Sequence, residues 1–177
     1  LVNIQATNAP HMLFSEDNVV AKFNHNKSQW GLFYNLSARN FKKTYTDIDE
    51  TYVLENKTIH RVQEGLHDQN KHFTHNIDLS YNLTEQDKYV FNVVFRNSVY
   101  DAPCLNQSNK LYDAADADNY IFSRLKNKQS SYTPSLDLYY QRTLPKNQML
   151  TMSVTGTLMH TDNNRLYHEY TPQAEDL

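Results

Sequence analysis

The chain has 177 residues, which is long enough for one domain with a buried core. Its 17 basic and 20 acidic side chains give a net charge of −3, so no strong positive field indicates a nucleic-acid partner. The single cysteine excludes an internal disulfide framework and a multi-cysteine zinc site. No apolar run approaches the roughly 18 residues that a transmembrane helix needs.

Alternation of apolar and polar residues is the main pattern along the chain, and it predicts strands with one face of each kind. It is weak from Trp30 to Leu36 and much cleaner at 73–83, where odd positions from Phe73 to Leu83 are mostly apolar and even positions are polar. Three later segments alternate in the same way: 89–99, 131–141 and 150–158. No comparable helical period occurs.

The predicted connections between these strands are of two unequal kinds. Three are short polar turns and two are long polar excursions, rich in Asp, Asn, Lys and Ser. The short turns are 25–29, 83–88 and 144–148, and the long excursions are about 46–70 and 100–129. Short turns at one end and long loops at the other are typical of a transmembrane barrel, with periplasmic turns and extracellular loops.

Aromatic side chains flank the short turns. Trp30, Tyr81, Tyr89 and Tyr140 fall on the apolar parity, as expected for a girdle of rings at one membrane–water interface. The strands are also of about the 10 residues that a tilted strand needs to cross the hydrocarbon. We therefore expect an all-β fold, an antiparallel meander of about seven long strands forming a segment of a transmembrane up-and-down β-barrel.

A soluble antiparallel fold is the main alternative. Tyr and Phe favour strands in any sheet, and in a sandwich the same apolar parity would face a second sheet. In that case Ile77, Leu79, Phe91, Leu136 and Val154 would meet across two sheets instead of forming one outward band. The function expected for that fold is a ligand- or carbohydrate-binding module.

Several stretches resemble the barrel portion of bacteroidete-type TonB-dependent outer-membrane receptors, the outer membrane protein β-barrel family. The resemblance extends from about Leu1 to Tyr170, and it is diffuse because barrel families share strand patterns more than fixed residues. The stretches that carry it are 22–36 (KFNHNKSQWGLFYNL), 75–78 (HNID), 80–83 (SYNL), 88–100 (KYVFNVVFRNSVY), 134–140 (PSLDLYY) and 154–163 (VTGTLMHTDN).

The resemblance implies a fold, a place in the cell and a set of partners. In that family a plug sits inside a barrel of about 22 strands, and energised opening imports a bulky nutrient. Residues 1–7 (LVNIQAT) look similar to the first barrel strand, so we expect 1–177 to be a partial outer-membrane β-barrel that holds the early strands and lacks the plug. The implied location is the bacterial outer membrane. The implied partners are outer-membrane lipid, the protein's own plug domain and remaining barrel strands, and a surface lipoprotein, with no nucleic acid.

Metal chemistry is not predicted. His60, His67, His72 and His75 are spaced unlike any standard ligand motif, and His75 falls on the apolar parity. The acidic run at 113–118 lacks the Asp-x-Asp-x-Asp-Gly spacing and the closing Glu of a calcium loop. We interpret both groups as loop and strand-end residues.

Catalytic residues and cofactors are not predicted either. Cys104 has no local His or orienting partner, and Asp47 and Asp49 are interpreted as solubilising loop residues. There is no Gly-x-Ser-x-Gly elbow, and the chain has only three glycines for a phosphate-binding loop. A β-rich enzyme such as a glycosidase domain is therefore the weakest hypothesis, and we expect a protein that is not an enzyme.

Ligand contacts of a receptor would lie in the long loops and on the polar parity. Asp78, Asn92, Arg96 and Asp137 lie on that parity, but each is explained equally well as part of a hydrogen-bonded wall. The sequence therefore assigns no ligand-binding residue and leaves the substrate open.

Overall fold

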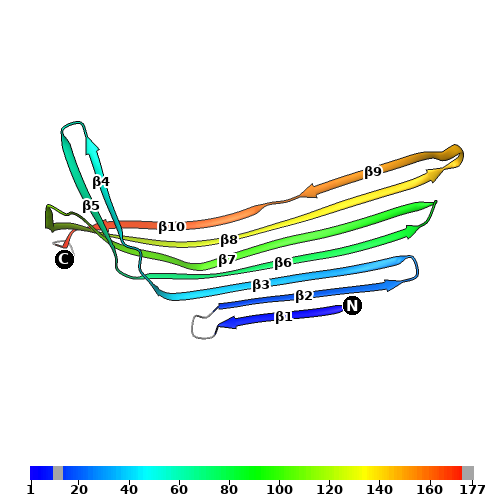
Figure 1. Cartoon of the computed structure of the whole chain (residues 1–177), viewed down its shortest axis with the longest axis horizontal. Coiled ribbons are helices and arrows are strands. Elements are labelled where there is room, and N and C mark those ends of the chain that lie inside the picture. The colour runs from blue at the N-terminus through cyan, green and yellow to red at the C-terminus, as the bar shows by residue number, and fades with distance from the viewer. Residues whose placement is uncertain (10–13, 173–177) are drawn as a thin grey trace. The chain divides into compact units, whose positions relative to one another are not determined.

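The computed structural model describes residues 1–9 and 14–172. Nearly all of the described chain is antiparallel β, which confirms the predicted fold class (Figure 1). The only element of another kind with described bounds is a 3-10 turn, η2 (Pro145–Asn147). The strands are β1 (Val2–Ala9), β2 (Phe14–His25), β3 (Ser28–Thr44), β4 (Ile48–Leu54), β5 (Lys57–Gly65), β6 (Asp68–Glu85), β7 (Tyr89–Asp113), β8 (Asp116–Leu144), β9 (Gln148–Thr157) and β10 (His160–Tyr170).

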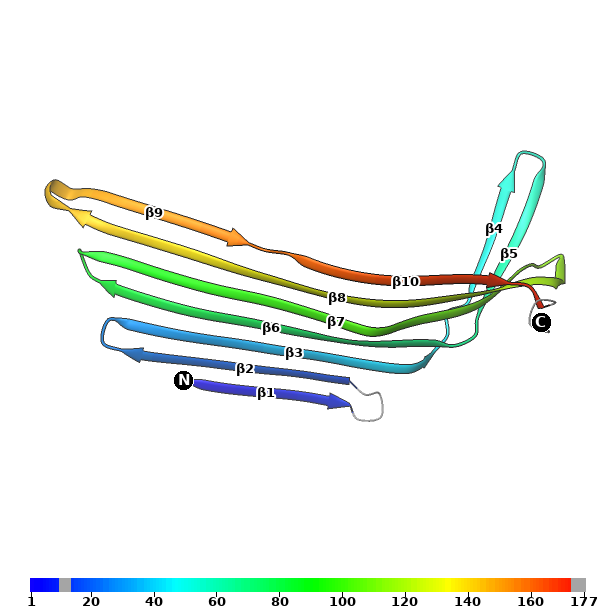
Figure 2. The ribbon, with the colours of Figure 1, turned by 180° about the vertical axis from the view of Figure 1, so that it is seen from behind.

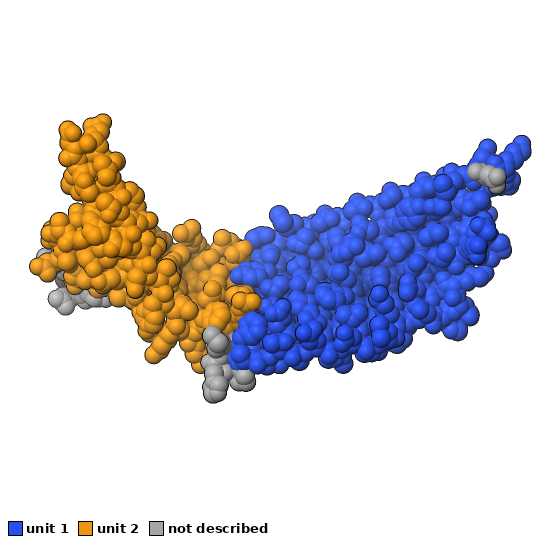
Figure 3. All heavy atoms as spheres, viewed as in Figure 1, with its two compact units in different colours: residues 1–38, 73–101, 130–162 blue, residues 39–72, 102–129, 163–177 orange. Residues whose placement is uncertain are grey.

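Contacts divide the chain into two compact units, coloured separately in Figure 3. Unit 1 comprises residues 1–38, 73–101 and 130–162. Unit 2 comprises residues 39–72, 102–129 and 163–177. The long strands β3, β6, β7 and β8 contribute residues to both units.

Unit 1 is a single open sheet of seven strands in the order β1-β2-β3-β6-β7-β8-β9. Within the described residues β1 pairs only with β2, and β9 pairs only with β8, so both edges lack a neighbour on one side. Figure 2 shows the same sheet from behind, with β1 again at its margin. The number of strands in this unit agrees with the prediction.

All three predicted short turns are present. Asn26, Asp87 and Lys146 have positive φ angles of 51°, 60° and 64°, a conformation that lets a strand reverse within very few residues. The carbonyl oxygen of Lys27 accepts a backbone bond from Thr84 at 3.0 Å, so the turn after β2 lies beside the end of β6. These turns fix the register of the strands that they join.

Unit 2 contradicts the prediction that 46–70 and 100–129 are long irregular loops. β4 and β5 form a hairpin in which Ile48 pairs with Gln63 and Leu54 with Lys57. β5 then pairs with the end of β7, from Arg61 opposite Asp113 to Gly65 opposite Asn109. The prediction failed because the apolar residues of these segments are scattered among polar ones or stand at consecutive positions, as at 52–54 and 120–122, so no regular alternation marks them as strands.

Neither unit has a conventional core. Among the described residues the buried apolar side chains are Ala21 and Ala102, and no large side chain is fully buried. The sheet of unit 1 is therefore one layer thick, because a facing second layer would bury a whole set of large side chains.

Candidate functional site

An exposed apolar face covers one side of the unit 1 sheet. At one edge Ile4 pairs with Val19 and is 70% exposed. Near the other edge Leu138 pairs with Val154, which is 57% exposed. Cross-strand partners point to the same side of a sheet. Side chains of the other parity bond to one another from β2 to β8, so the apolar side chains of these strands share the remaining side as one set. The rest of this apolar face comprises Val2, Phe23, Trp30, Leu32, Leu79, Leu136, Leu150 and Met152.

An aromatic cluster lies beside the short turns on this apolar face. The ring centroids of Trp30 and Tyr81 are 4.3 Å apart, and those of Tyr81 and Phe91 are 6.3 Å apart. The hydroxyl of Tyr81 also lies 3.2 Å from that of Ser28, at the start of β3. The cluster thus has an apolar body and a polar edge at the turns, as sequence parity predicted.

The opposite face of unit 1 is polar and joined across strands. The amide of Asn35 donates to Asn18 at 2.8 Å and accepts from Asn76 at 3.2 Å. The hydroxyl of Ser98 donates to Oδ1 of the same Asn76 at 2.8 Å. These four side chains, the amide ladder, connect β2, β3, β6 and β7.

Of the four polar-parity residues considered as ligand contacts, the structure brings two together. Arg96 forms an ion pair with Asp137, linking β7 to β8. Asp78 lies in β6 and Asn92 in β7, and among the described residues no hydrogen bond joins either of them to this pair. The arrangement is that of a hydrogen-bonded wall and does not form a cavity.

A charged clasp joins two of the short turns. Oε1 of Glu85 lies 2.9 Å from Nζ of Lys27 and 2.7 Å from Nζ of Lys88. Hydrogen bonds from Lys88 and then Lys27 lower the pKa of Glu85 from its usual 4.5 to about 2. The carboxylate therefore stays charged over the whole physiological range.

The four histidines considered as metal ligands each contact a different partner. His60 pairs with Asp49, His75 bonds the hydroxyl of Tyr34 at 2.9 Å, and His72 bonds Asn70 at 2.8 Å. The ring of His67 packs edge-on against Tyr45. In the described part of the chain no group of three or more His, Cys, Asp or Glu side chains could hold a metal ion.

Several of the histidines and acidic residues lie in strands where loops were expected, whereas His75 lies in a strand as the alternation predicted. His60 lies in β5 and His72 and His75 lie in β6, so only His67 is outside a strand. Asp49 lies in β4, Asp113 ends β7, and Asp116 and Asp118 belong to β8. Cys104 is a half-buried free thiol within β7, not a loop residue.

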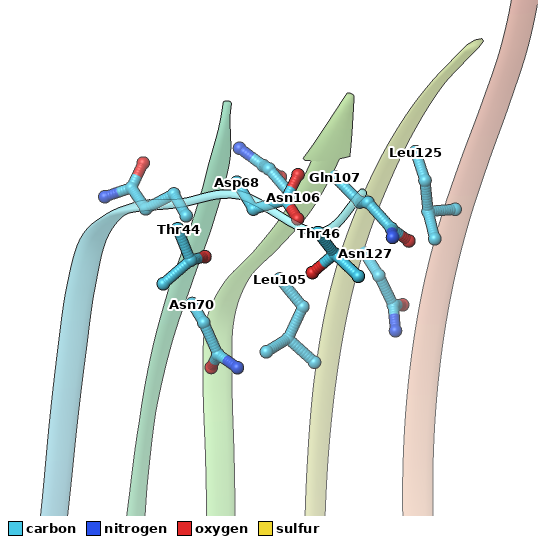
Figure 4. A pocket seen from close by; sticks show the side chains of 10 residues that line it. Thr44, Thr46, Asp68, Asn70, Leu105, Asn106, Gln107, Leu125 and Asn127 are labelled. Atoms are coloured by element: carbon cyan, nitrogen blue, oxygen red, sulfur yellow. The ribbon is translucent and has the colours of Figure 1, made fainter. Parts of the chain in front are cut away.

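A polar pocket of about 300 Å³ lies entirely within unit 2. Five amide side chains line it, and they come from β6, β7 and β8: Gln69, Asn70, Asn106, Gln107 and Asn127. Figure 4 shows how Asn70, Leu105 and Asn127 approach from neighbouring strands, with Thr46 on the connection between β3 and β4. Sequence reasoning missed this pocket because its side chains are dispersed over four segments and form no motif.

The wall that carries Thr46 is fixed by a close backbone approach. The N–H of Gly65 donates to Oδ1 of Asp47 at 2.9 Å. A Cβ on Gly65 would lie 2.5 Å from the backbone nitrogen of Thr46, so only glycine fits there. Asp68, another lining residue, links β6 to β7, because its Oδ1 accepts the N–H of Ser108 at 2.9 Å.

Among the described residues no helix has the length and apolar character needed to cross a bilayer.

Comparison with known proteins assigns no family to the chain. No protein-family model matches it, and a search of curated proteins finds no matching relative.

Proposed function

We propose that this chain is a segment of an outer-membrane receptor or transporter barrel, with the apolar face of unit 1 against lipid. In that role the whole protein imports a bulky nutrient, energised through a plug domain. The observation that carries the proposal is the apolar face itself, which is exposed and belongs to a sheet one layer thick. Soluble monomers rarely expose a contiguous apolar patch of this kind.

The two faces of unit 1 support this role together. Lipid requires apolar side chains outside, while a barrel interior is polar. The amide ladder and the Arg96–Asp137 ion pair supply the polar side. The unpaired edges at β1 and β9 support it further, because backbone groups in hydrocarbon need partners, which the remaining barrel strands would supply.

Trp30 makes the proposal testable, since it is the only tryptophan in the chain and is 54% exposed on the apolar face. The 177-residue chain is refolded into phosphatidylcholine vesicles that contain lipids brominated either near the headgroup or deep in the acyl chain. Bromine quenches indole fluorescence only at short range. We expect strong quenching, and more from the shallow bromine than from the deep one, because Trp30 lies beside a turn.

A matched control moves the reporter to the other face. In Trp30→Phe/Phe33→Trp the indole occupies a neighbouring position of β3 with the opposite parity, so it should be quenched far less. Equal quenching in the two proteins would contradict the proposed orientation. A monodisperse, detergent-free monomer whose Trp30 fluorescence is not quenched by the brominated vesicles would instead favour a soluble binding module.

A further inference from the structure

The pocket of unit 2 has an unusual chemical lining. Of the ten described side chains that form it, five are amides, two are threonine hydroxyls and two are leucines. Asp68 is the only charged residue among them; it is buried, and one of its oxygens is already bonded to the Ser108 N–H. The pocket therefore offers many neutral donors and acceptors and little net charge.

Two of the amides are arranged so that particular atoms remain for a ligand. Oδ1 of Asn127 is buried and has no hydrogen-bond partner among the described residues. A buried acceptor without a partner is costly, and a ligand hydroxyl would satisfy it. Asn70 offers a donor where Asn127 offers an acceptor. Its Oδ1 is hydrogen-bonded to Nδ1 of His72 at 2.8 Å, so its NH₂ group is the part that can bond to a ligand in the pocket.

The apolar part of the lining completes the description. Leu105 and Leu125 stand on the adjacent strands β7 and β8 and give the pocket an apolar side between its amides. The volume of about 300 Å³ is at the lower end for small-molecule sites. A compact ligand with C–H groups and several hydroxyls meets both requirements.

We propose that the unit 2 pocket binds a neutral, multiply hydroxylated ligand of about the size of a sugar ring. Asn127 Oδ1 accepts from one ligand hydroxyl, and the Asn70 amide donates to another. Thr46, on the connection between β3 and β4, supplies a hydroxyl that both donates and accepts. This inference concerns unit 2 alone and does not depend on whether the apolar face of unit 1 contacts lipid.

The test is binding of simple sugars to the full chain. The protein is held in lauryldimethylamine oxide, since a glucoside or maltoside detergent would compete for the pocket. Saturation-transfer NMR and calorimetry then compare glucose and N-acetylglucosamine with the anionic glucuronate. We expect saturable binding of at least one neutral sugar, with a Kd on the order of 1 mM for so small a ligand. Glucuronate should bind at least about tenfold more weakly, because Asp68 is the only charged group in the lining and repels a second carboxylate.

Two variants attribute the binding to this pocket. Asn127→Leu removes the buried acceptor and should weaken binding by about tenfold, while its melting temperature stays level or rises, since no partner is left unpaired. Thr46→Val removes a hydroxyl from the lining and should weaken binding severalfold. Asn164→Leu, an exposed substitution in β10 of the same unit, is the control and should change neither.

Three results would contradict sugar binding in this pocket. Absence of saturable binding by either neutral sugar, equal binding of glucuronate, or an Asn127→Leu variant that binds as the parent does would each overturn the proposal. Quenching of Trp30 by brominated lipid is measured separately in unit 1. Failure of the pocket is therefore distinguishable from failure of the proposed membrane role.

Discussion

Gly65 is the residue on which the shape of the pocket depends most directly. It needs no positive φ; its role is to lack a Cβ where the backbone of Thr46 passes. Both the nitrogen and the carbonyl oxygen of Thr46 would lie under 3 Å from an added Cβ, at 2.5 and 2.8 Å. Backbone atoms cannot rotate away as the end of a flexible side chain can, so the whole connection would have to move.

Gly65→Ala should therefore destabilise unit 2 by about 1–3 kcal/mol, the usual cost of forcing an extra methyl group into a tight contact. It should also weaken ligand binding, because Thr46 is displaced. Urea unfolding followed by tryptophan and tyrosine emission gives the stability, and the sugar titration gives the binding. Gly156→Ala is the matched control, since a Cβ there meets nothing within 4 Å; equal effects of the two substitutions would contradict this account.

At the level of elements, the turns and the strands that they join were predictable for a clear reason. Alternation identified the strands β6 to β9 clearly and β3 weakly, while β1 was expected only from the family resemblance. Polar breaks located the turns after β2, β6 and β8. In unit 2 the last part of β7 and the first part of β8 mix amides, serines and lysines with apolar residues that do not alternate, so parity did not identify these strands. The pocket was hidden for the same reason, because amides such as Asn127 resemble loop composition until neighbouring strands bring them together.

The charged clasp gives an element-scale expectation for pH. A carboxyl whose folded pKa lies below its unfolded value stabilises the fold above the unfolded value and loses that effect as the pH falls through the folded one. For Glu85 the stabilisation is complete above about pH 4.5 and is lost towards pH 2. The effect is small because the lysines are exposed to solvent.

The measurement is an NMR titration of the Glu85 carboxyl carbon in the parent and in Lys88→Met. We expect a midpoint near pH 2 in the parent and a clearly higher midpoint in the variant, because Lys88 is the largest cause of the lowered pKa. Lys57→Met, in the β4–β5 hairpin, serves as the control and should leave the midpoint unchanged. A parent midpoint close to 4.5 would show that the clasp does not persist in solution.

At the scale of the molecule, the expected partial barrel already implied a sheet with one apolar face and open edges. The alternation in β6 to β9 predicted the apolar face. Alternation alone could not show which strands form the edges among the described residues, because an edge strand such as β1 has the same alternating pattern as a central one. Pairing partners are a property of the assembled sheet.

The lack of a conventional core has a calorimetric consequence. A globular domain unfolds with a heat-capacity increase of about 12–15 cal/mol/K per residue, because unfolding hydrates apolar groups that were dry. Here the apolar face of unit 1 is already exposed in the folded chain, so little apolar surface remains to be hydrated. Calorimetry of the chain in detergent-free buffer, at a concentration low enough to avoid association, should give a per-residue value well below that range, and a globular value would contradict the single-layer sheet. If detergent covers the apolar face, as the proposed membrane role requires, the melting temperature in micelles should depend on the length of the detergent's acyl chain more than on substitutions within the sheet.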